Sequence, residues 1–403
     1  MHKFTKKSFT LLDCYDLCTM FSTTQKIGIL GGGQLGKMLC LAAAPLDFKT
    51  YILESDPGCP AAAYANGTTI GDFKNYDDVL AFGQDKDVIT IEIEHVNTAA
   101  LKALEVMGKI VHPSPAALEI IKDKGLQKQF YAQNGIPTMP FELFEHESDV
   151  LKAVESGHLA LPFVQKTRTA GYDGKGVAVI RNETDLSTKL LPGACVIEEL
   201  ADMDLEIAVI AVRNAKDEVA VFPAVEMDFH PEANLVEMLI CPARISALVA
   251  AQAEALAEQV IRTFDICGLL AVEMFLNKNG DLVVNEVAPR PHNSGHHTID
   301  SAVTNQFQQH LRAICNLPLG DTAQVRPAVM LNVLGEPGHK GAVQYEGAAE
   351  CLAIPGVYLH LYGKAMTAPY RKMGHVTIVD DTIEKAIEKG KMVKGLLKVT
   401  AIT

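Results

Sequence analysis

The segment KIGILGGGQLGKMLCLAAAPL, which begins at Lys26, constrains the fold more than any other stretch. An apolar run ends in three glycines, and apolar residues then recur at helical spacing. This order predicts a strand, a tight turn and a helix, the first half of a parallel βαβ unit. Strand and helix patterns alternate to about residue 122, so we expect an N-terminal α/β domain with a parallel sheet over residues 25–122.

The rest of the chain predicts two further units. Residues 123–317 form a central α+β domain with a small lid subdomain at about 138–200, and residues 318–403 form a small β-rich C-terminal domain. Residues 1–24 are expected to be a disordered extension. The central domain has predicted strands at 195–199, 204–212 and 218–229 and a hairpin with Asn279-Gly280 in its turn.

The charge balance limits the choice of partners. The 403 residues carry 36 basic and 49 acidic side chains, for a net charge of −13. An acidic chain without a basic stretch is a poor ligand for nucleic acid or a membrane surface. Nine scattered cysteines without a CxxC pair favour a reducing, cytoplasmic compartment.

Gly31, Gly33 and Gly36 fit the pattern GxGxxG between a strand and a helix, with Glu54 eighteen residues further on. Backbone amides at such a turn can bind a phosphate. Taken alone, the pattern suggests a dinucleotide-dependent dehydrogenase, or a tight turn without any cofactor.

A second glycine-rich loop lies in VQKTRTAGYDGKGVAVI, where Lys166 ends a strand. A glycine flap can lay amides over phosphates while a neighbouring lysine holds their charge. Glu198, Glu199 and Glu206 lie at the ends of the next two strands, where carboxylates can accept from ribose hydroxyls. The alternatives are a plain surface hairpin and solvated acids.

The hairpin around Asn279-Gly280 predicts a metal site. If Asn277 and Leu282 close its turn, Phe275 faces Val284 and Glu273 faces Glu286. Like charges directly opposite each other in a sheet are destabilising, and a divalent cation between them removes the penalty. Mg²⁺ commonly takes one or two carboxylates together with substrate phosphates.

Ionisable side chains gather after this hairpin in NEVAPRPHNSGHH. Arg290 offers a planar donor fork for an anion, and His292 and Asn293 can hold a small oxyanion. Lys364, Arg371 and Lys372 form a separate basic cluster in YGKAMTAPYRKMGHV, which suits a phosphate-bearing substrate. A solvated basic face is the alternative.

Together these motifs resemble an ATP-grasp ligase. GGGQLGKM, EIEHV, GYDGKG, the hairpin glutamates, NEVAPRPHNSGH and RKMGH are similar to the N5-carboxyaminoimidazole ribonucleotide synthetase family over residues 25–380. The resemblance implies a three-domain fold, ATP and Mg²⁺ (or Mn²⁺) as cofactors, and a homodimer. It also implies functional coupling to the mutase that acts next in purine biosynthesis.

The resemblance also implies site residues. ATP would contact Lys124, Lys166, Gly171, Tyr172, Asp173, Gly174, Lys175, Gly176, Val177, Glu198, Glu199, Leu200, Ala201, Glu206, His230, Asn285 and Glu286. Aminoimidazole ribonucleotide would contact Gly33, Gln34, Leu35, Glu94, Tyr172, Asp173, Lys175, Lys364, Arg371 and Lys372. Bicarbonate would meet Arg290, His292, Asn293 and Lys364, and the metal would meet Glu273 and Glu286.

The implied reaction is the ATP-dependent carboxylation of aminoimidazole ribonucleotide by bicarbonate, through carboxyphosphate. The nearest rival is a formate-dependent glycinamide ribonucleotide transformylase, which shares the ATP residues. A dehydrogenase and a non-catalytic binding protein are the rivals from other classes.

Overall fold

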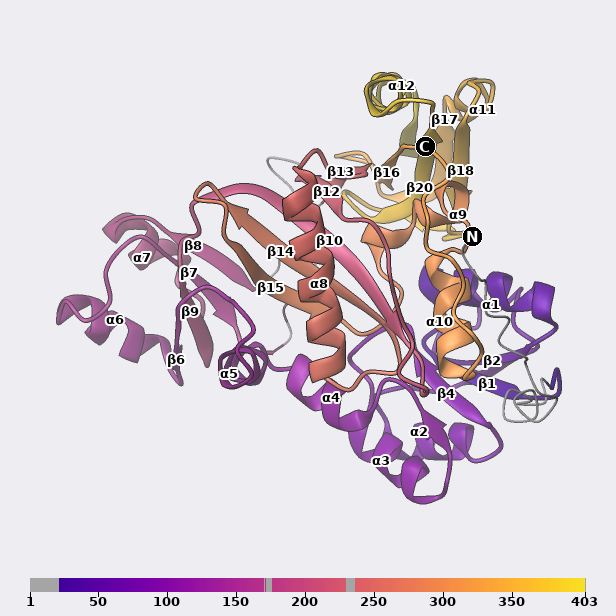
Figure 1. Ribbon diagram of the computed structural model, residues 1–403, viewed down its shortest axis with the longest axis horizontal. Helices are drawn as coiled ribbons and strands as arrows, with labels where there is room; N and C mark the ends of the chain where they lie inside the picture. The colour runs from indigo at the N-terminus through magenta and orange to yellow at the C-terminus, as the bar shows by residue number, and fades with distance from the viewer. Residues whose placement is uncertain (1–21, 170, 172–175, 230–235, 403) are drawn as a thin grey trace, which may run out of the picture.

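The computed structural model describes residues 22–169, 171, 176–229 and 236–402 (Figure 1), so most of the predicted extension lies outside the described residues. The N-terminal domain consists of β1 (Lys26–Leu30), α1 (Gln34–Ala43), η2 (Ala44–Leu46), β2 (Lys49–Glu54), β3 (Gly67–Ile70), α2 (Tyr76–Gly83), β4 (Val88–Ile91), α3 (Thr98–Val106), β5 (Ile110–Val111) and α4 (Pro115–Ile121).

Its five strands form the expected parallel sheet, in the order β3-β2-β1-β4-β5. All four residues of β4 are buried, because helices cover both faces of a parallel sheet. The strand order reverses between β1 and β4. Ligands of open α/β sheets bind outside the carboxyl ends of the strands at such a point, where the glycine turn and Glu94 lie here.

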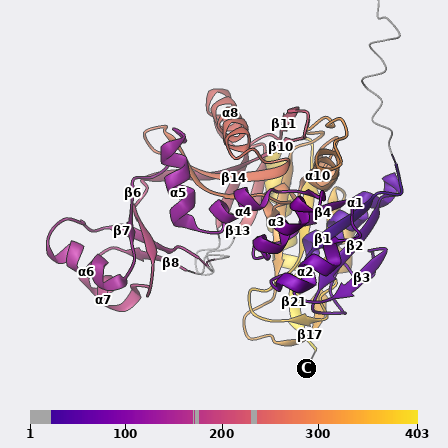
Figure 2. The same cartoon turned by 90° about the horizontal axis from the view of Figure 1, so that it is seen from below.

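The central domain contains a lid and a larger body. The lid and the helix before it comprise α5 (Lys124–Gln133), β6 (Phe141–Phe144), α6 (Glu147–Glu155), β7 (Phe163–Thr167), β8 (Val177–Ile180), α7 (Glu183–Lys189) and β9 (Cys195–Glu199). The lid strands pair in the order β6-β9-β7-β8, all antiparallel. Figures 1 and 2 place this lid at one end of the molecule, away from the N-terminal sheet.

The body of the central domain is an antiparallel sheet with helices packed on it. Its elements are β10 (Met203–Arg213), β11 (Val219–Val221), β12 (Val225–Phe229), β13 (Val236–Cys241), α8 (Ala247–Thr263), β14 (Gly268–Asn277), β15 (Leu282–Ala288), η3 (Asn293–Gly295), α9 (Thr298–Ser301) and α10 (Gln306–Ile314). The buried residues Ala253, Leu256, Ala257, Val260 and Ile261 recur every three or four positions along α8. They form the apolar stripe that packs on residues of β10 and β14. Figure 1 shows α8 lying across these strands.

Helix α10 joins the central domain to the N-terminal domain. Asn305 and Gln308 form a capping box at its start, which satisfies amides that no helical carbonyl can reach. Phe307, Leu311 and Ile314 then pack into the same apolar cluster as α1. The side chains that follow the hairpin are therefore held close to the N-terminal sheet.

The C-terminal domain extends the central sheet. Its elements are β16 (Ala328–Leu334), β17 (Gly341–Glu346), α11 (Ala348–Leu352), β18 (Val357–Leu361), β19 (Met366–Thr367), β20 (Lys372–Val379), α12 (Ile383–Leu396) and β21 (Lys398–Ala401). Strand β16 pairs with β13, so one nine-stranded sheet runs β15-β14-β10-β12-β13-β16-β20-β18, with β11 on β10. Strands β17, β19 and β21 form a separate small sheet.

Two predictions about the strands were wrong. The predicted strand 218–229 is two strands, β11 and β12, because Pro223 between them cannot donate to a ladder. The turn of the β14–β15 hairpin is closed by Leu276 opposite Leu282, not by Asn277.

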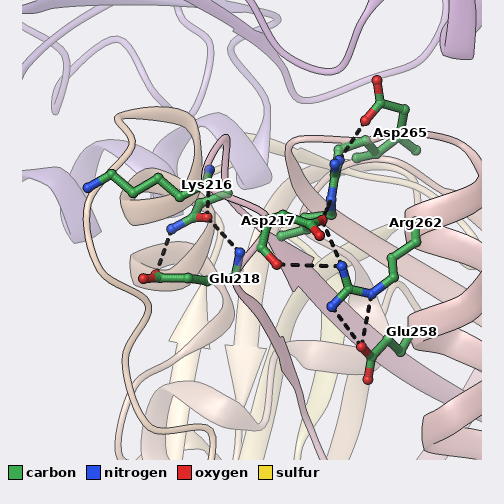
Figure 3. Close-up of polar contacts among 9 residues, drawn as sticks. Lys216, Asp217, Glu218, Glu258, Arg262 and Asp265 are labelled. Carbon is green, nitrogen blue, oxygen red and sulfur yellow. Dashed lines mark hydrogen bonds and ion pairs between the residues drawn. The ribbon is translucent and has the colours of Figure 1, made fainter.

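The turn from β10 to β11 is fixed by a cluster of polar contacts with the end of α8 (Figure 3). Asp217 lies 2.5 Å from Arg213 Nε and 2.7 Å from Arg262 Nη1, and Arg213 also bonds Asp265 at 2.8 Å. Asp217 and Asp265 are largely exposed, and exposed ion pairs contribute at most about 1 kcal/mol each. The cluster therefore orders a surface turn.

None of the helices in the described part of the chain is long and apolar enough to span a membrane.

Candidate functional site

Three carboxylates meet on neighbouring strands of the central sheet. Glu273 on β14 lies directly opposite Glu286 on β15, as predicted, and Glu206 on β10 lies one diagonal step from Glu273. Burial, followed by the charges of Glu286 and Glu206, raises the pKa of Glu273 well above its ordinary value. Burial and Glu286 raise the pKa of Glu206 to about 7. These three carboxylates therefore lack enough neighbouring positive charge to keep all of them ionised.

The Glu273–Glu286 pairing arises from a bulge that the sequence did not reveal. Met274 pairs with Val284 and Glu273 pairs with Glu286, so Asn285 is an extra residue without an opposite number. The predicted Phe275–Val284 pair was wrong, since Phe275 faces Val283. The turn is one residue longer than predicted, and the bulge restores the register. Bulges re-aim side chains next to functional sites.

Two lysines reach the bulged end of this hairpin from the lid side. Lys124, the first residue of α5, forms an ion pair with Glu286 and lowers the pKa of that carboxyl to about 2. Lys166 on β7 donates to the Asn285 side-chain oxygen at 2.7 Å. Both predicted ATP lysines therefore converge on the bulged end of the hairpin.

A buried lysine that the sequence analysis missed lies behind them. Glu198 on β9 is 2.9 Å from Lys166 Nζ and 3.0 Å from Lys128 Nζ, and its side chain is only 2% exposed. Burial lowers the pKa of Lys128 to about 8, while its amine also donates to Thr138 at 2.6 Å. Lys128 lies one helical turn after Lys124, and that spacing was the available signal.

The segment after the hairpin lies between the other two domains. Arg290 Nε is 2.8 Å from the Glu94 carboxylate of the N-terminal domain. His292 Nε2 is 3.6 Å from Glu273, and its Nδ1 shares a hydrogen bond of 2.9 Å with Ser294. Asn293 bonds the side chain of Asn332 on β16. Side chains predicted to meet bicarbonate thus adjoin those predicted to meet the metal and the ribonucleotide.

The basic cluster of the C-terminal domain adjoins the same region. Lys364 Nζ donates to the Lys372 carbonyl at 2.8 Å, and Arg371 donates to the Met366 carbonyl at 2.7 Å. The charge of Lys372 acts on Glu273, whose pKa it lowers against the larger effect of burial. The charge of Lys372 thus favours the ionised form of the Glu273 carboxyl.

The glycine turn binds a carboxylate of the protein itself. The amides of Gly33 and Gly36 donate to Glu92 at 2.5 and 2.6 Å, and the Gly32 amide donates to Glu54 at 3.0 Å. Burial raises the pKa of Glu92. Amides that would hold a dinucleotide phosphate are already used, which removes the basis of the dehydrogenase hypothesis. The Gly33 amide is not available to a ribonucleotide while this bond lasts.

Several predicted residues lie at the margins of the site. Glu199 and Leu200 are exposed at the end of β9, and Ala201 and Gln34 are half-buried, whereas Leu35 is buried. Gly171, Gly176 and Val177 flank the flap. Tyr172, Asp173, Gly174, Lys175 and His230 lie outside the described residues.

Comparison with known proteins assigns all three domains. Residues 24–122 match the ribonucleotide synthetase preATP-grasp domain, residues 129–307 the ATP-grasp domain, and residues 328–389 the phosphoribosylaminoimidazole carboxylase C-terminal domain. The N5-carboxyaminoimidazole ribonucleotide synthase of Brucella melitensis is 37% identical over 356 residues, which cover 87% of this chain and 95% of that protein. The chain belongs to the N5-carboxyaminoimidazole ribonucleotide synthase family.

Solved structures of this family have the same fold. The N5-carboxyaminoimidazole ribonucleotide synthetase of Thermotoga maritima superposes with a TM-score of 0.86 at 42% identity, over 94% of this chain and 100% of that one. The Aspergillus clavatus synthase, solved with ADP and 5-aminoimidazole ribonucleotide, superposes with a TM-score of 0.84 at 32% identity, over 92% of this chain and 98% of that one. Curated phosphoribosylaminoimidazole carboxylases of yeasts are longer, and the chain spans 66% of their length.

Membership of this family confirms the predicted three-domain ATP-grasp fold. The predicted use of ATP agrees with solved structures of family members that contain ADP or ATP.

Proposed function

We propose that this chain carboxylates 5-aminoimidazole ribonucleotide with bicarbonate and ATP, giving N5-carboxyaminoimidazole ribonucleotide, ADP and phosphate. The observation that supports this most is the convergence of three sets of side chains. Carboxylates from the β14–β15 hairpin, lysines from α5 and β7, and the Arg290–Asn293 segment meet at one end of the central sheet.

The hairpin end suits a nucleotide with its metal. Glu273 and Glu286 present acceptor oxygens opposite each other, and the raised pKa of Glu273 reflects a need for positive charge, so the donor set fits Mg²⁺. Mg²⁺, when bound there, would neutralise charge on the phosphates of ATP. Lys124 and Lys166 would hold phosphate oxygens, with Lys124 leaving Glu286 as the ligands enter. The other predicted ATP residues, from Gly171 to Glu206 along the lid and at His230, would hold the rest of the nucleotide.

Bicarbonate would lie between Arg290, His292, Asn293 and Lys364. From there its oxygen would attack the γ-phosphorus of ATP, and the bond from that phosphorus to the bridging oxygen of ADP would break. The product, carboxyphosphate, hydrolyses readily in water, so the lid strands and the glycine flap would exclude solvent.

The ribonucleotide would bind at the switch point of the N-terminal sheet, beside Glu94 and the glycine turn. Lys364, Arg371 and Lys372 would hold its phosphate. Tyr172, Asp173 and Lys175, which lie outside the described residues, are the other predicted contacts of the ribonucleotide. Its exocyclic amine would then attack the carboxyl carbon of carboxyphosphate, or CO₂ released from it. Phosphate would leave, and the amine would lose one proton as the carbamate forms.

We also propose that the enzyme is a cytoplasmic homodimer whose carbamate product passes to a mutase. The curated yeast relatives named phosphoribosylaminoimidazole carboxylase extend beyond the length of this chain. Light scattering of the purified protein would test the dimer, and a monomer at assay concentrations would refute it.

The test of the function is ADP release from Mg-ATP with aminoimidazole ribonucleotide, with and without bicarbonate, while carbamate is measured in parallel. ADP release and product that need both substrates support the proposal. ADP release that responds to formate and glycinamide ribonucleotide instead would favour the formate-dependent transformylase. No ADP release from folded protein under either condition would favour a binding protein.

A further inference from the structure

Asn293 is held by a residue of the C-terminal domain. Its side-chain Nδ2 donates to Asn332 Oδ1 at 2.8 Å, and Asn332 Nδ2 donates back to Asn293 Oδ1 at 3.0 Å. Asn332 lies on β16, which belongs to the extended sheet. A side chain of the ligase centre is thus paired, amide to amide, with a residue that no sequence motif marks.

A pair of amides joined by two hydrogen bonds does not fix its own orientation. If both side chains turn over, oxygen and nitrogen exchange places and both bonds are restored. A third contact decides between the two arrangements here. Asn332 Nδ2 also donates to the backbone carbonyl of Val236 at 2.7 Å, and a carbonyl only accepts hydrogen bonds. Asn332 must therefore direct its NH₂ group toward Val236.

The orientation of Asn332 fixes that of Asn293. The oxygen of Asn332 faces Asn293, so Asn293 must present its NH₂ group to that oxygen. This bond uses one of the two N–H groups of Asn293. Within the described part of the chain the second N–H has no partner, so it can donate to an anion.

The backbone around Asn293 is anchored by other contacts with the same domain. The rings of His296 and His375 lie 4.8 Å apart, and Asp300 bonds His360 Nε2 at 2.8 Å. Residues 293, 296 and 300 have helical spacing and meet β16, β20 and β18 in turn. Loss of the Asn332 amide should therefore free the orientation of the Asn293 side chain more than the position of its backbone.

We infer that Asn332 is a positioning residue for bicarbonate: it fixes the side-chain amide of Asn293 so that the remaining N–H points to the anion. The inference rests on the proposed function, since it takes bicarbonate as the ligand of Asn293. It assigns the C-terminal domain a part in the ligase reaction besides its basic side chains.

The test is a double-mutant cycle with Asn332→Ala, Asn293→Ala and the combined variant, assayed by ADP release at varied bicarbonate. We expect Asn332→Ala to raise the KM for bicarbonate about tenfold, which is about 1.4 kcal/mol. The KM for ATP should change less than twofold. In the Asn293→Ala background the second substitution should have no further effect on bicarbonate kcat/KM, because Asn332 acts through Asn293.

Independent effects of the two substitutions, or equal losses toward ATP and bicarbonate, would overturn the inference and indicate a purely structural role. Asn332→Ser, which keeps a small polar side chain on β16 but has no amide to pair with Asn293, provides a second variant if Asn332→Ala does not fold. Wild-type ADP release that ignores bicarbonate would refute the proposed function and the inference with it. If wild-type ADP release depends on bicarbonate but the effects of the two substitutions are additive, the inference alone is refuted.

Discussion

Glu273→Gln should make the metal-free protein more stable while abolishing ATP turnover. Glu273 and Glu286 are directly opposed on neighbouring strands, and the Glu273 side chain is only 15% exposed. The Cβ atoms of directly opposed residues lie about 5 Å apart, and two unit charges at that separation repel by roughly 3 kcal/mol at an effective dielectric constant of about 20. Lys124 neutralises part of the Glu286 charge, so about 1–2 kcal/mol of this repulsion remains.

The stability that Glu273→Gln gains over wild type should increase with pH. The pKa of Glu273 in the folded protein lies above its ordinary value of 4.5, so the folded state binds more protons than the unfolded state between the two values. Wild-type stability therefore falls as pH rises through this interval, at up to about 1.4 kcal/mol per pH unit. The glutamine variant has no proton to lose there. Its melting temperature should exceed that of wild type by roughly 1–3 °C near pH 8.

Glu286→Gln is the matched control, with the opposite sign. Lys124 lowers the pKa of Glu286 to about 2, so this carboxylate contributes stability above pH 4.5 that is lost as pH falls toward 2. The Glu286 side chain is 43% exposed, and solvent screening limits the contribution to about 1 kcal/mol. This variant should melt slightly below wild type at pH 8 and should also lack ATP turnover.

The assay is thermal unfolding in EDTA and in Mg-ATP at pH 6, 7 and 8. Saturating Mg-ATP should stabilise wild type more than either glutamine variant. If Glu273→Gln is destabilised in EDTA at pH 8, the two carboxylates do not repel and the electrostatic reasoning is wrong. If it still turns over ATP, the metal assignment is wrong.

Three further perturbations follow from the packing. Lys128→Met removes one of two cations from buried Glu198 and should lower the free energy of unfolding, measured by urea denaturation, by about 3–5 kcal/mol. Adding Glu198→Gln should recover part of this loss, and additive losses in the double variant would contradict the ion pair. Glu92→Gln leaves one glycine-turn amide without an acceptor, so it should lower the free energy of unfolding by about 1–3 kcal/mol and raise the KM for the ribonucleotide. An unchanged KM would show that the glycine turn does not contribute to ribonucleotide binding. Gly295→Ala would overlap neighbouring side chains and should lower the melting temperature, whereas Gly395→Ala, on an open helix surface, should raise it slightly.

Local sequence patterns predicted the elements well because periodicity follows directly from burial. The glycine turn, the β14–β15 hairpin and the parallel N-terminal sheet were all predictable in this way. The bulge at Asn285 was not, since an extra residue in a strand leaves no mark in hydropathy. The Glu273–Glu286 pair was predicted correctly only because an error in the turn and the missing bulge cancel.

Contacts between distant segments were beyond the sequence. Lys128 reads as one more lysine on a helix until Glu198 is seen to lie between it and Lys166. Glu92 stands in the quoted motif EIEHV, yet only the fold shows that its oxygens occupy the glycine turn. Asn332 lies in an apolar strand, and its partner is 39 residues away.

The pairing of β13 with β16 limits where this chain can be divided into separately folding fragments. Met238–Cys241 bonds Ala328–Leu331 across the position, near residue 317, where sequence alone would divide the chain. A cut there would expose two apolar strand edges, which recruit other chains and promote aggregation. Chimaeras that exchange the last module alone should therefore precipitate. The lid has its own sheet and offers a better place to exchange sequence between homologues.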